Sequence, residues 1–149
     1  MARPKDIGTA AETAVVKALR AHGFPHAERR ALAGTYDLGD ITGCPGIVWE
    51  VKGGEAAKSA SDGQIASWLV ETETERVNAR ADVGVLVVQR RGVGPRNAHR
   101  WWAILPASYI FPTLSADEDF PIRTLLSSAC YILRRAGYGQ PLESAVAGG

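Results

Sequence analysis

The stretch Ile47-Val48-Trp49-Glu50-Val51-Lys52 follows the turn residues Pro45 and Gly46. β-branched and aromatic residues dominate it, so it predicts a β-strand. Because side chains alternate between the two faces of a strand, Glu50 and Lys52 point to one face with Val48, while Ile47, Trp49 and Val51 point to the other. An acid and an amine therefore leave the end of one strand side by side.

A second carboxylate precedes this strand. Asp40-Ile41-Thr42 predicts a short strand, and the turn over residues 43–46 folds the chain back, which brings Asp40 opposite the Glu50 strand as in a hairpin. Two carboxylates then converge beside Lys52. Such oxygen ligands suit Mg²⁺, with Mn²⁺ able to substitute, and the ion would polarise a phosphoryl oxygen and lower the pKa of a bound water. The alternative is an ordinary surface ion pair at a strand end.

Other residues extend this pattern along the chain. In order they are a helix carrying Glu12, then Gly23-Phe24, Gly39-Asp40-Ile41, Pro45-Gly46, residues 48–52, and Gln64. Over roughly the first two thirds of the chain, the pattern resembles the PD-(D/E)xK nuclease superfamily. It is most similar to the Holliday-junction resolvases of archaea and their relatives in bacterial viruses.

The resemblance implies a role for each matching residue. By position, Asp40, Glu50 and Glu12 would bind the metal, and Lys52 would assist the attacking water. Gln64 corresponds to a glutamine that related nucleases carry near the start of the helix after the lysine strand. These five residues are the predicted catalytic set.

One position departs from the superfamily pattern. The proline expected just before the aspartate is absent, and Gly39 stands there instead. Asp37 lies three residues before Asp40, so the motif alone leaves open which of the two binds metal. We prefer Asp40, because residues 41 and 42 continue it as a strand, and Asp37 could lie behind it.

Glu12 and Gln64 also have a structural interpretation. The apolar residues of 9–22 recur at helical spacing, and this predicted helix begins with a capping box in which Glu12 would accept from a backbone amide. Ser61-Asp62-Gly63-Gln64 is also a capping box, with Ser61 as the cap of a second predicted helix at about residues 62–80. For both residues, capping and a role in the site remain alternatives.

The periodicity of the rest of the chain predicts one α/β domain spanning residues 1–149. Residues 83–88 are almost continuously apolar, as expected of a central strand buried on both faces. The predicted elements are a first helix, strands near residues 27–31, at 40–42 and at 47–52 forming a meander, a long helix whose charged outer face carries Glu71, Glu73 and Glu75, strands at 83–88 and 101–105, and a final helix begun near Pro121.

This order matches the αβββαβ core of the superfamily. We therefore expect a restriction-endonuclease-like fold, with a central mixed sheet flanked by helices. The core would cover about residues 6–105, with a C-terminal helical extension at about 121–139.

Charge is nearly balanced in the whole chain, at a formal net +1, so DNA binding would depend on local clusters. Between the last two predicted core strands, a glycine-containing segment carries basic residues and no acid. We predict that this flexible loop contacts phosphates through Arg90, Arg91, Arg96 and Arg100, and that Arg29 and Arg30 add charge near the site. The alternative is an ordinary solvated hairpin. Alternation buries one of Trp101 and Trp102, so base stacking is open only to the other.

Other features limit the class of protein. Cys44 and Cys130 form no metal-binding spacing with the three histidines, so a zinc site is not expected. The sequence contains no apolar run long enough to span a bilayer and no signal-peptide pattern near Met1. We therefore expect a cytoplasmic protein, in the host cell if the gene is that of a phage, and no membrane partner.

With the resemblance, these observations predict a Mg²⁺-dependent, structure-selective DNA endonuclease. Its expected role is that of a Holliday-junction resolvase in recombination and repair, and paired nicks imply a homodimer. Alternatives are an exonuclease, repair or restriction nuclease of the same superfamily, a catalytically inactive DNA-binding relative, and a metal site for another phosphoryl substrate. No GxxxxGKS phosphate loop supports the last of these.

Overall fold

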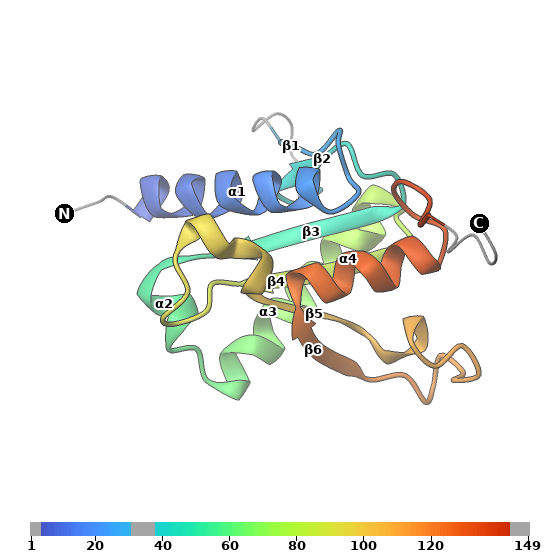
Figure 1. The fold of residues 1–149 in the computed structure, drawn as a ribbon. Coiled ribbons are helices and arrows are strands. Elements are labelled where there is room, and N and C mark those ends of the chain that lie inside the picture. Colours follow the sequence, from blue (N-terminus) through green and yellow to red (C-terminus); the bar gives the residue numbers. More distant parts are fainter. Residues whose placement is uncertain (1–3, 31–37, 144–149) are drawn as a thin grey trace.

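A four-stranded sheet lies at the centre of the computed structural model, which describes residues 4–30 and 38–143 (Figure 1). Its strands are β3 (Ile47–Lys52), β4 (Val83–Val88), β5 (Trp102–Pro106) and β6 (Pro121–Leu125), in that spatial order. β3 and β4 are parallel, whereas β5 is antiparallel to both β4 and β6. The sheet is therefore mixed, as expected.

Helices cover both faces of this sheet. α1 (Pro4–Ala21) and α4 (Leu126–Arg135) lie on one face, and α3 (Asp62–Ala79) lies on the other, behind the sheet in Figure 1. The short α2 (Gly54–Lys58) joins β3 to α3. Because α3 crosses over between two parallel strands, the carboxyl ends of β3 and β4 lie at the same end of the sheet. None of the helices in the described part of the chain combines the length and apolar character that a membrane crossing requires.

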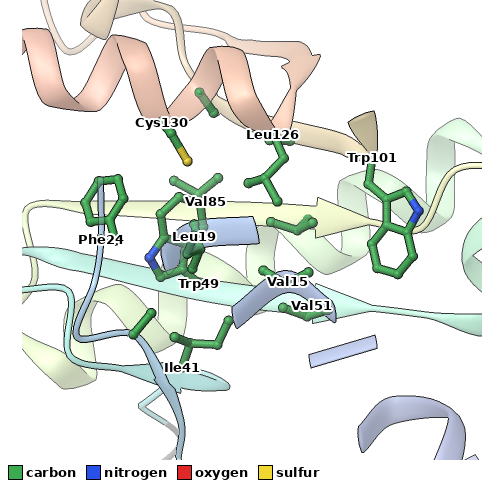
Figure 2. Close-up of a cluster of buried hydrophobic side chains, with 14 of the residues drawn as sticks. Val15, Leu19, Phe24, Ile41, Trp49, Val51, Val85, Trp101, Leu126 and Cys130 are labelled. Carbon is green, nitrogen blue, oxygen red and sulfur yellow. The ribbon is translucent and has the colours of Figure 1, made fainter. Parts of the chain in front are cut away.

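The larger hydrophobic core lies between the sheet and the α1/α4 layer. Trp49 is fully buried there, and its ring meets Phe24 edge-on with centroids 5.9 Å apart. Figure 2 shows Leu126 and Cys130 pointing from α4 toward the strands. The predicted alternation of β3 is confirmed, since Ile47, Trp49 and Val51 enter this core while Glu50 and Lys52 face α3.

Two very short strands precede β3. β1 (Glu28–Arg29) and β2 (Ile41–Thr42) pair antiparallel as a separate two-stranded sheet. The segment then runs along the free edge of β3, where the Asp40 amide donates to the Trp49 carbonyl oxygen at 2.9 Å. The predicted meander is thus present only in part, because β2 does not join the main sheet.

The first helix begins earlier than predicted. It starts at Pro4, so Thr9 lies within the helix rather than at its N-terminal cap. Proline is favoured in the first turn of a helix, where its missing N–H would have no partner. The predicted capping box of Glu12 is therefore wrong.

The C-terminal region also differs from the prediction. Residues 121–125 form β6, which pairs with all five residues of β5, and the helix starts only at Leu126. Local periodicity indicated one helix because Ile122 and Leu125 share its apolar spacing, but pairing with β5 satisfies the backbone of both strands. Proline is tolerated at the first residue of such an edge strand.

The segment between β4 and β5 is packed rather than flexible. It contains η1 (Pro95–Arg100), a short 3₁₀ segment that lies against α1. Val93 and Ala98 are buried, and Nε1 of Trp101 donates to the Val93 carbonyl oxygen at 2.8 Å. A second 3₁₀ turn, η2 (Ala107–Tyr109), follows β5. The prediction of a flexible loop is therefore wrong.

Candidate functional site

Asp40, Glu50 and Lys52 meet at the edge of the sheet where β3 ends. The Val51 amide donates to Oδ2 of Asp40 at 2.8 Å, which fixes this carboxyl beside the strand. Asp40 and Glu50 are joined by a side-chain hydrogen bond. Nζ of Lys52 lies 3.9 Å from Oε1 of Glu50. The structure thus brings together the three residues that the sequence singled out first.

Gly39 explains the departure from the expected proline. Its φ is +93°, whereas the ring of proline holds φ near −65°. A Cβ at this position would come within 2.8 Å of Cγ1 of Val48. The close approach of this segment to β3 therefore requires glycine just before Asp40. Asp37, the alternative metal ligand, lies outside the described residues.

Helix α3 contributes two carboxylates that were predicted to face solvent. Glu75 is fully buried beside Glu50 and contributes to the raised pKa of that residue, and Oε1 of Glu71 lies 3.2 Å from Nζ of Lys52. The prediction of a charged outer face is therefore wrong for Glu75. A signal was present in the sequence, because Glu75 lies seven residues after Trp68, on the stripe that faces the sheet.

Gly84 allows α3 to lie this close to the sheet. It occupies the β4 position opposite Val48, and a Cβ there would come within 2.9 Å of Cγ2 of Thr72. Thr72 is one turn before Glu75 on α3, so the missing side chain of Gly84 helps to bring Glu75 to Glu50.

The site holds four carboxyl groups and one lysine. Burial, together with the hydrogen bond and the charge of the neighbouring Glu50, raises the pKa of Asp40 to about 8. Burial also raises the pKa of Glu50 to about 8, with a contribution from Glu75. Burial lowers the pKa of Lys52, but the charges of Glu50, Glu71 and Asp40 outweigh this and raise it overall. Lys52 is thus an ammonium, and Asp40 and Glu50 retain their protons to higher pH than ordinary carboxyls.

The carboxylates have the chemistry and spacing of a divalent-cation site. One oxygen from each of Glu50, Glu71 and Glu75 lies within 4.8 Å of the others. Ligands that contact Mg²⁺ or Ca²⁺ at about 2.0–2.6 Å can be up to about 5 Å apart across the ion. Asp40 adjoins this group through Glu50. The residues present therefore fit a hard cation, and α3 supplies two carboxylates that the sequence did not indicate.

Glu12 lies at the margin of the site. Nε of Arg29 donates to its Oε2 at 2.9 Å, and Nη2 of Arg29 donates to Oγ1 of Thr9 at 3.3 Å. Burial raises the pKa of Glu12, and the charge of Asp40 adds to this effect. Glu12 is thus close enough to Asp40 to sense its charge, while its carboxylate is held by Arg29.

Gln64 is exposed in the first turn of α3. Its backbone N–H donates to Oγ of Ser61 at 3.1 Å, which confirms that Ser61 caps this helix. Gln64 lies on the same helical stripe as Trp68, Glu71 and Glu75, two turns before Glu71.

The predicted basic cluster is divided between the two faces of the sheet. Arg90 lies over the ring of Trp102 at 4.2 Å, on the α3 face, and Arg91 pairs with Glu55 there at 2.9 Å. Arg96 instead lines a cavity of about 580 Å³ between α1 and η1, on the other face. Of the remaining predicted DNA contacts, Arg29 pairs with Glu12, the Arg30 amide donates to the Asp40 carbonyl oxygen, and Arg100 is exposed.

The paired tryptophans follow the predicted alternation. Trp101 is fully buried in the core, and Trp102 is half-buried on the opposite face. Arg90 and Arg123 both lie over the Trp102 ring, so little of this ring is left for a base to stack on.

Comparisons of the chain with protein-family models, with curated proteins and with solved structures each found no match. The function is therefore inferred from the geometry above. A cluster of carboxylates that holds a divalent cation next to a lysine ammonium can bind a phosphate, and the cation can polarise it.

Proposed function

We propose that this chain is a metal-dependent DNA endonuclease that hydrolyses phosphodiester bonds by attack of an activated water. The observation that carries the proposal is the convergence of Asp40 and Glu50 beside Lys52, from two segments that meet at the edge of the sheet. A surface ion pair would not need this arrangement, because Glu50 is only 4% exposed and shares its site with other carboxyls.

The residues of the site divide the work of hydrolysis. A bound Mg²⁺ or Mn²⁺ would polarise a phosphoryl oxygen and lower the pKa of the attacking water. Glu50, Glu71 and Glu75 would hold the ion, with Asp40 next to them. Lys52 places positive charge where the phosphate becomes more negative in the transition state. Its Nζ lies 5.6 Å from the centre of the Trp68 ring, which covers it on one side.

Several features support the finer part of the proposal. The order α1, β1, β2, β3, α3, β4, with β3 parallel to β4, is compatible with a restriction-endonuclease-like αβββαβ core. Selectivity for four-way junctions and other branched DNA rests on the resemblance to the resolvases. Because a resolvase makes paired nicks, the proposal includes a two-fold homodimer with one site in each subunit.

The test is incubation of the purified protein with a labelled four-way junction and the matching linear duplex, in Mg²⁺ and in chelator. Symmetric, Mg²⁺-dependent nicks confined to the junction are the expected result. Cutting of both substrates would keep the nuclease and remove the junction selectivity. A protein that binds DNA but cuts neither substrate in Mg²⁺ or Mn²⁺ would be a binding relative, and the proposal would be wrong.

Asp40→Asn is the matched variant for this test, because it keeps the size of the side chain and removes a carboxylate. Glu73→Gln is the control, since Glu73 is exposed on the outer face of α3 and pairs with Arg76. We expect the first variant to lose cleavage and the second to retain it.

A further inference from the structure

A second polar cavity lies on the α3 face of the sheet, beside the first turn of α3. It has a volume of about 260 Å³ and brings together cations from α2, from the residues after β4 and from β6. These cations are Lys58, Arg90, Arg91 and Arg123, and the acid among the lining residues is Asp62. Because its members are far apart in the sequence, only the folded chain forms this group.

Two of these cations are held in place by an aromatic ring instead of a carboxylate. The guanidinium groups of Arg90 and Arg123 lie 4.2 Å and 4.6 Å from the centre of the Trp102 ring. Arg90 follows β4 and Arg123 lies on β6, the strands on either side of β5, which carries Trp102. The negative face of an indole attracts a cation, so the ring of Trp102 holds both guanidinium groups without a carboxylate.

The other two cations are already partly neutralised. Arg91 and Lys58 both pair with Glu55, at 2.9 Å and 3.5 Å. Within residues 4–30 and 38–143, no carboxylate lies at ion-pair distance from Arg90 or Arg123. Nη1 of Arg90 donates to the Arg100 carbonyl oxygen at 3.4 Å, and the other N–H donors of the two guanidinium groups carry no ion pair within these residues. The planar fork of a guanidinium matches two oxygens of a phosphate.

The cavity lies at the same end of the sheet as the carboxylate site. Lys52, Val88 and Trp102 are neighbours on β3, β4 and β5, and each is a terminal residue of its strand. Two strand spacings separate Lys52 from Trp102, which is about 10 Å. The axial rise of one DNA strand is about 3.4 Å per nucleotide and its phosphates are farther apart than this rise, so the separation corresponds to about three nucleotides at most.

We propose that Arg90 and Arg123, held on the ring of Trp102, bind the phosphodiester backbone of a DNA strand within about three nucleotides of the bond at the Lys52 site. The identity of the anion as DNA rests on the proposed nuclease function. The inference assigns Arg123 to DNA binding, a residue that the sequence placed in a helix. It also gives Trp102 the role of positioning two phosphate contacts instead of stacking on a base.

The test measures binding of a labelled junction by fluorescence anisotropy over a series of salt concentrations, in chelator so that nothing is cut. The variant is the double replacement Arg90→Gln with Arg123→Gln. The control is Lys17→Gln with Arg135→Gln, which removes the same charge at two exposed positions outside this cavity. Each phosphate contact contributes about 0.9 to the slope of log affinity against log salt concentration. We expect the first variant to lose about 1.8 of that slope and the control to keep it.

Two further variants separate binding from folding. Arg90→Lys with Arg123→Lys keeps both charges, and we expect it to recover most of the slope. Trp102→Leu keeps both arginines but removes their support, and we expect weaker binding with a slope near that of the wild type. Thermal unfolding of each variant identifies any that fails to fold. An equal slope in the glutamine variant and the wild type would overturn the proposal.

The outcome also separates this inference from the proposed function. If the wild type cuts DNA and the glutamine variant has an unchanged slope, the proposed nuclease function is supported and the proposed DNA contacts of Arg90 and Arg123 are contradicted. If the wild type binds DNA through this cavity but does not cut it in Mg²⁺, the DNA contacts are supported and the proposed nuclease function is contradicted. No DNA binding by the wild type would overturn the inference.

Discussion

The two sides of helix α3 differ in charge and in burial. Toward β3 the helix places Glu75 and Glu71 against Glu50 and Lys52, where the chain is negative and largely closed to solvent. Toward β5 it adjoins the cavity that holds Arg90 and Arg123, where the chain is positive and more open. Buried charges shift their pKa values and require a partner, whereas open charges are screened by solvent and remain available to a ligand. The first side is therefore suited to chemistry and the second to binding.

The largest expected effect is on cleavage. We expect Glu50→Gln and Lys52→Ala each to lower the rate by at least about 100-fold, because each removes charge that the transition state requires. DNA affinity measured in chelator should change little, because the cavity with Arg90 is separate. Single-turnover assays together with anisotropy would show both effects. Retained cleavage in both folded variants would remove the assignment of the site.

The pH dependence of stability would sharpen the comparison. Burial raises the pKa of Asp40 and Glu50 from ordinary values of 3.8 and 4.5 to about 8. Between about pH 4 and pH 8 the folded protein therefore holds protons that the unfolded chain releases, so stability is lost as the pH rises through this range.

We expect the Tm of the metal-free protein to be lower at pH 8.5 than at pH 6, by several degrees. At this chain length, each 1 kcal/mol corresponds to about 2–4 °C. Mg²⁺ or Mn²⁺ should raise Tm more at pH 8.5 than at pH 6, because the ion must displace fewer protons. Differential scanning fluorimetry would measure this. A metal-free Tm that is equal at both pH values, or higher at pH 8.5, would contradict the prediction.

A matched pair on α3 tests whether the helix contributes ligands. Glu75→Gln should weaken Mn²⁺ binding by roughly ten-fold or more, since it removes a carboxylate from a buried group. Glu73→Gln should leave the affinity unchanged, because Glu73 lies on the exposed face. Isothermal titration calorimetry would measure both affinities. Equal affinities in the two variants would instead support the ligand set predicted from the sequence, which is Asp40, Glu50 and Glu12.

The smallest effect is expected on the basic side. Arg91 and Glu55 form an exposed ion pair, and such pairs add little to stability. We expect Arg91→Ala to change Tm by less than about 2 °C. A larger loss would show that the basic side supports the fold, and would weaken the contrast between the two sides of α3.

Local sequence was sufficient where neighbours along the chain decide the outcome. The period of two on residues 47–52 correctly placed Glu50 and Lys52 together, and the turn before them brought Asp40 alongside. Local sequence was insufficient for residues 121–125, because their apolar spacing is compatible with both a helix and a paired strand. Pairing with β5 decided between them, and that contact is not local.

The amino-acid sequence by itself determined a strand with an acid and a lysine on one face, the carboxylate that joins them, the buried strand at 83–88 and the cap at Ser61. These features depend on steric alternation, turn chemistry and hydrogen bonds within a few residues. Only the tertiary structure decided that Glu75 is buried in the site and that Arg123 joins Arg90 on Trp102. The face that α3 turns toward the sheet depends on its close packing against Gly84. The order of the strands also depends on contacts between segments that are distant in the sequence.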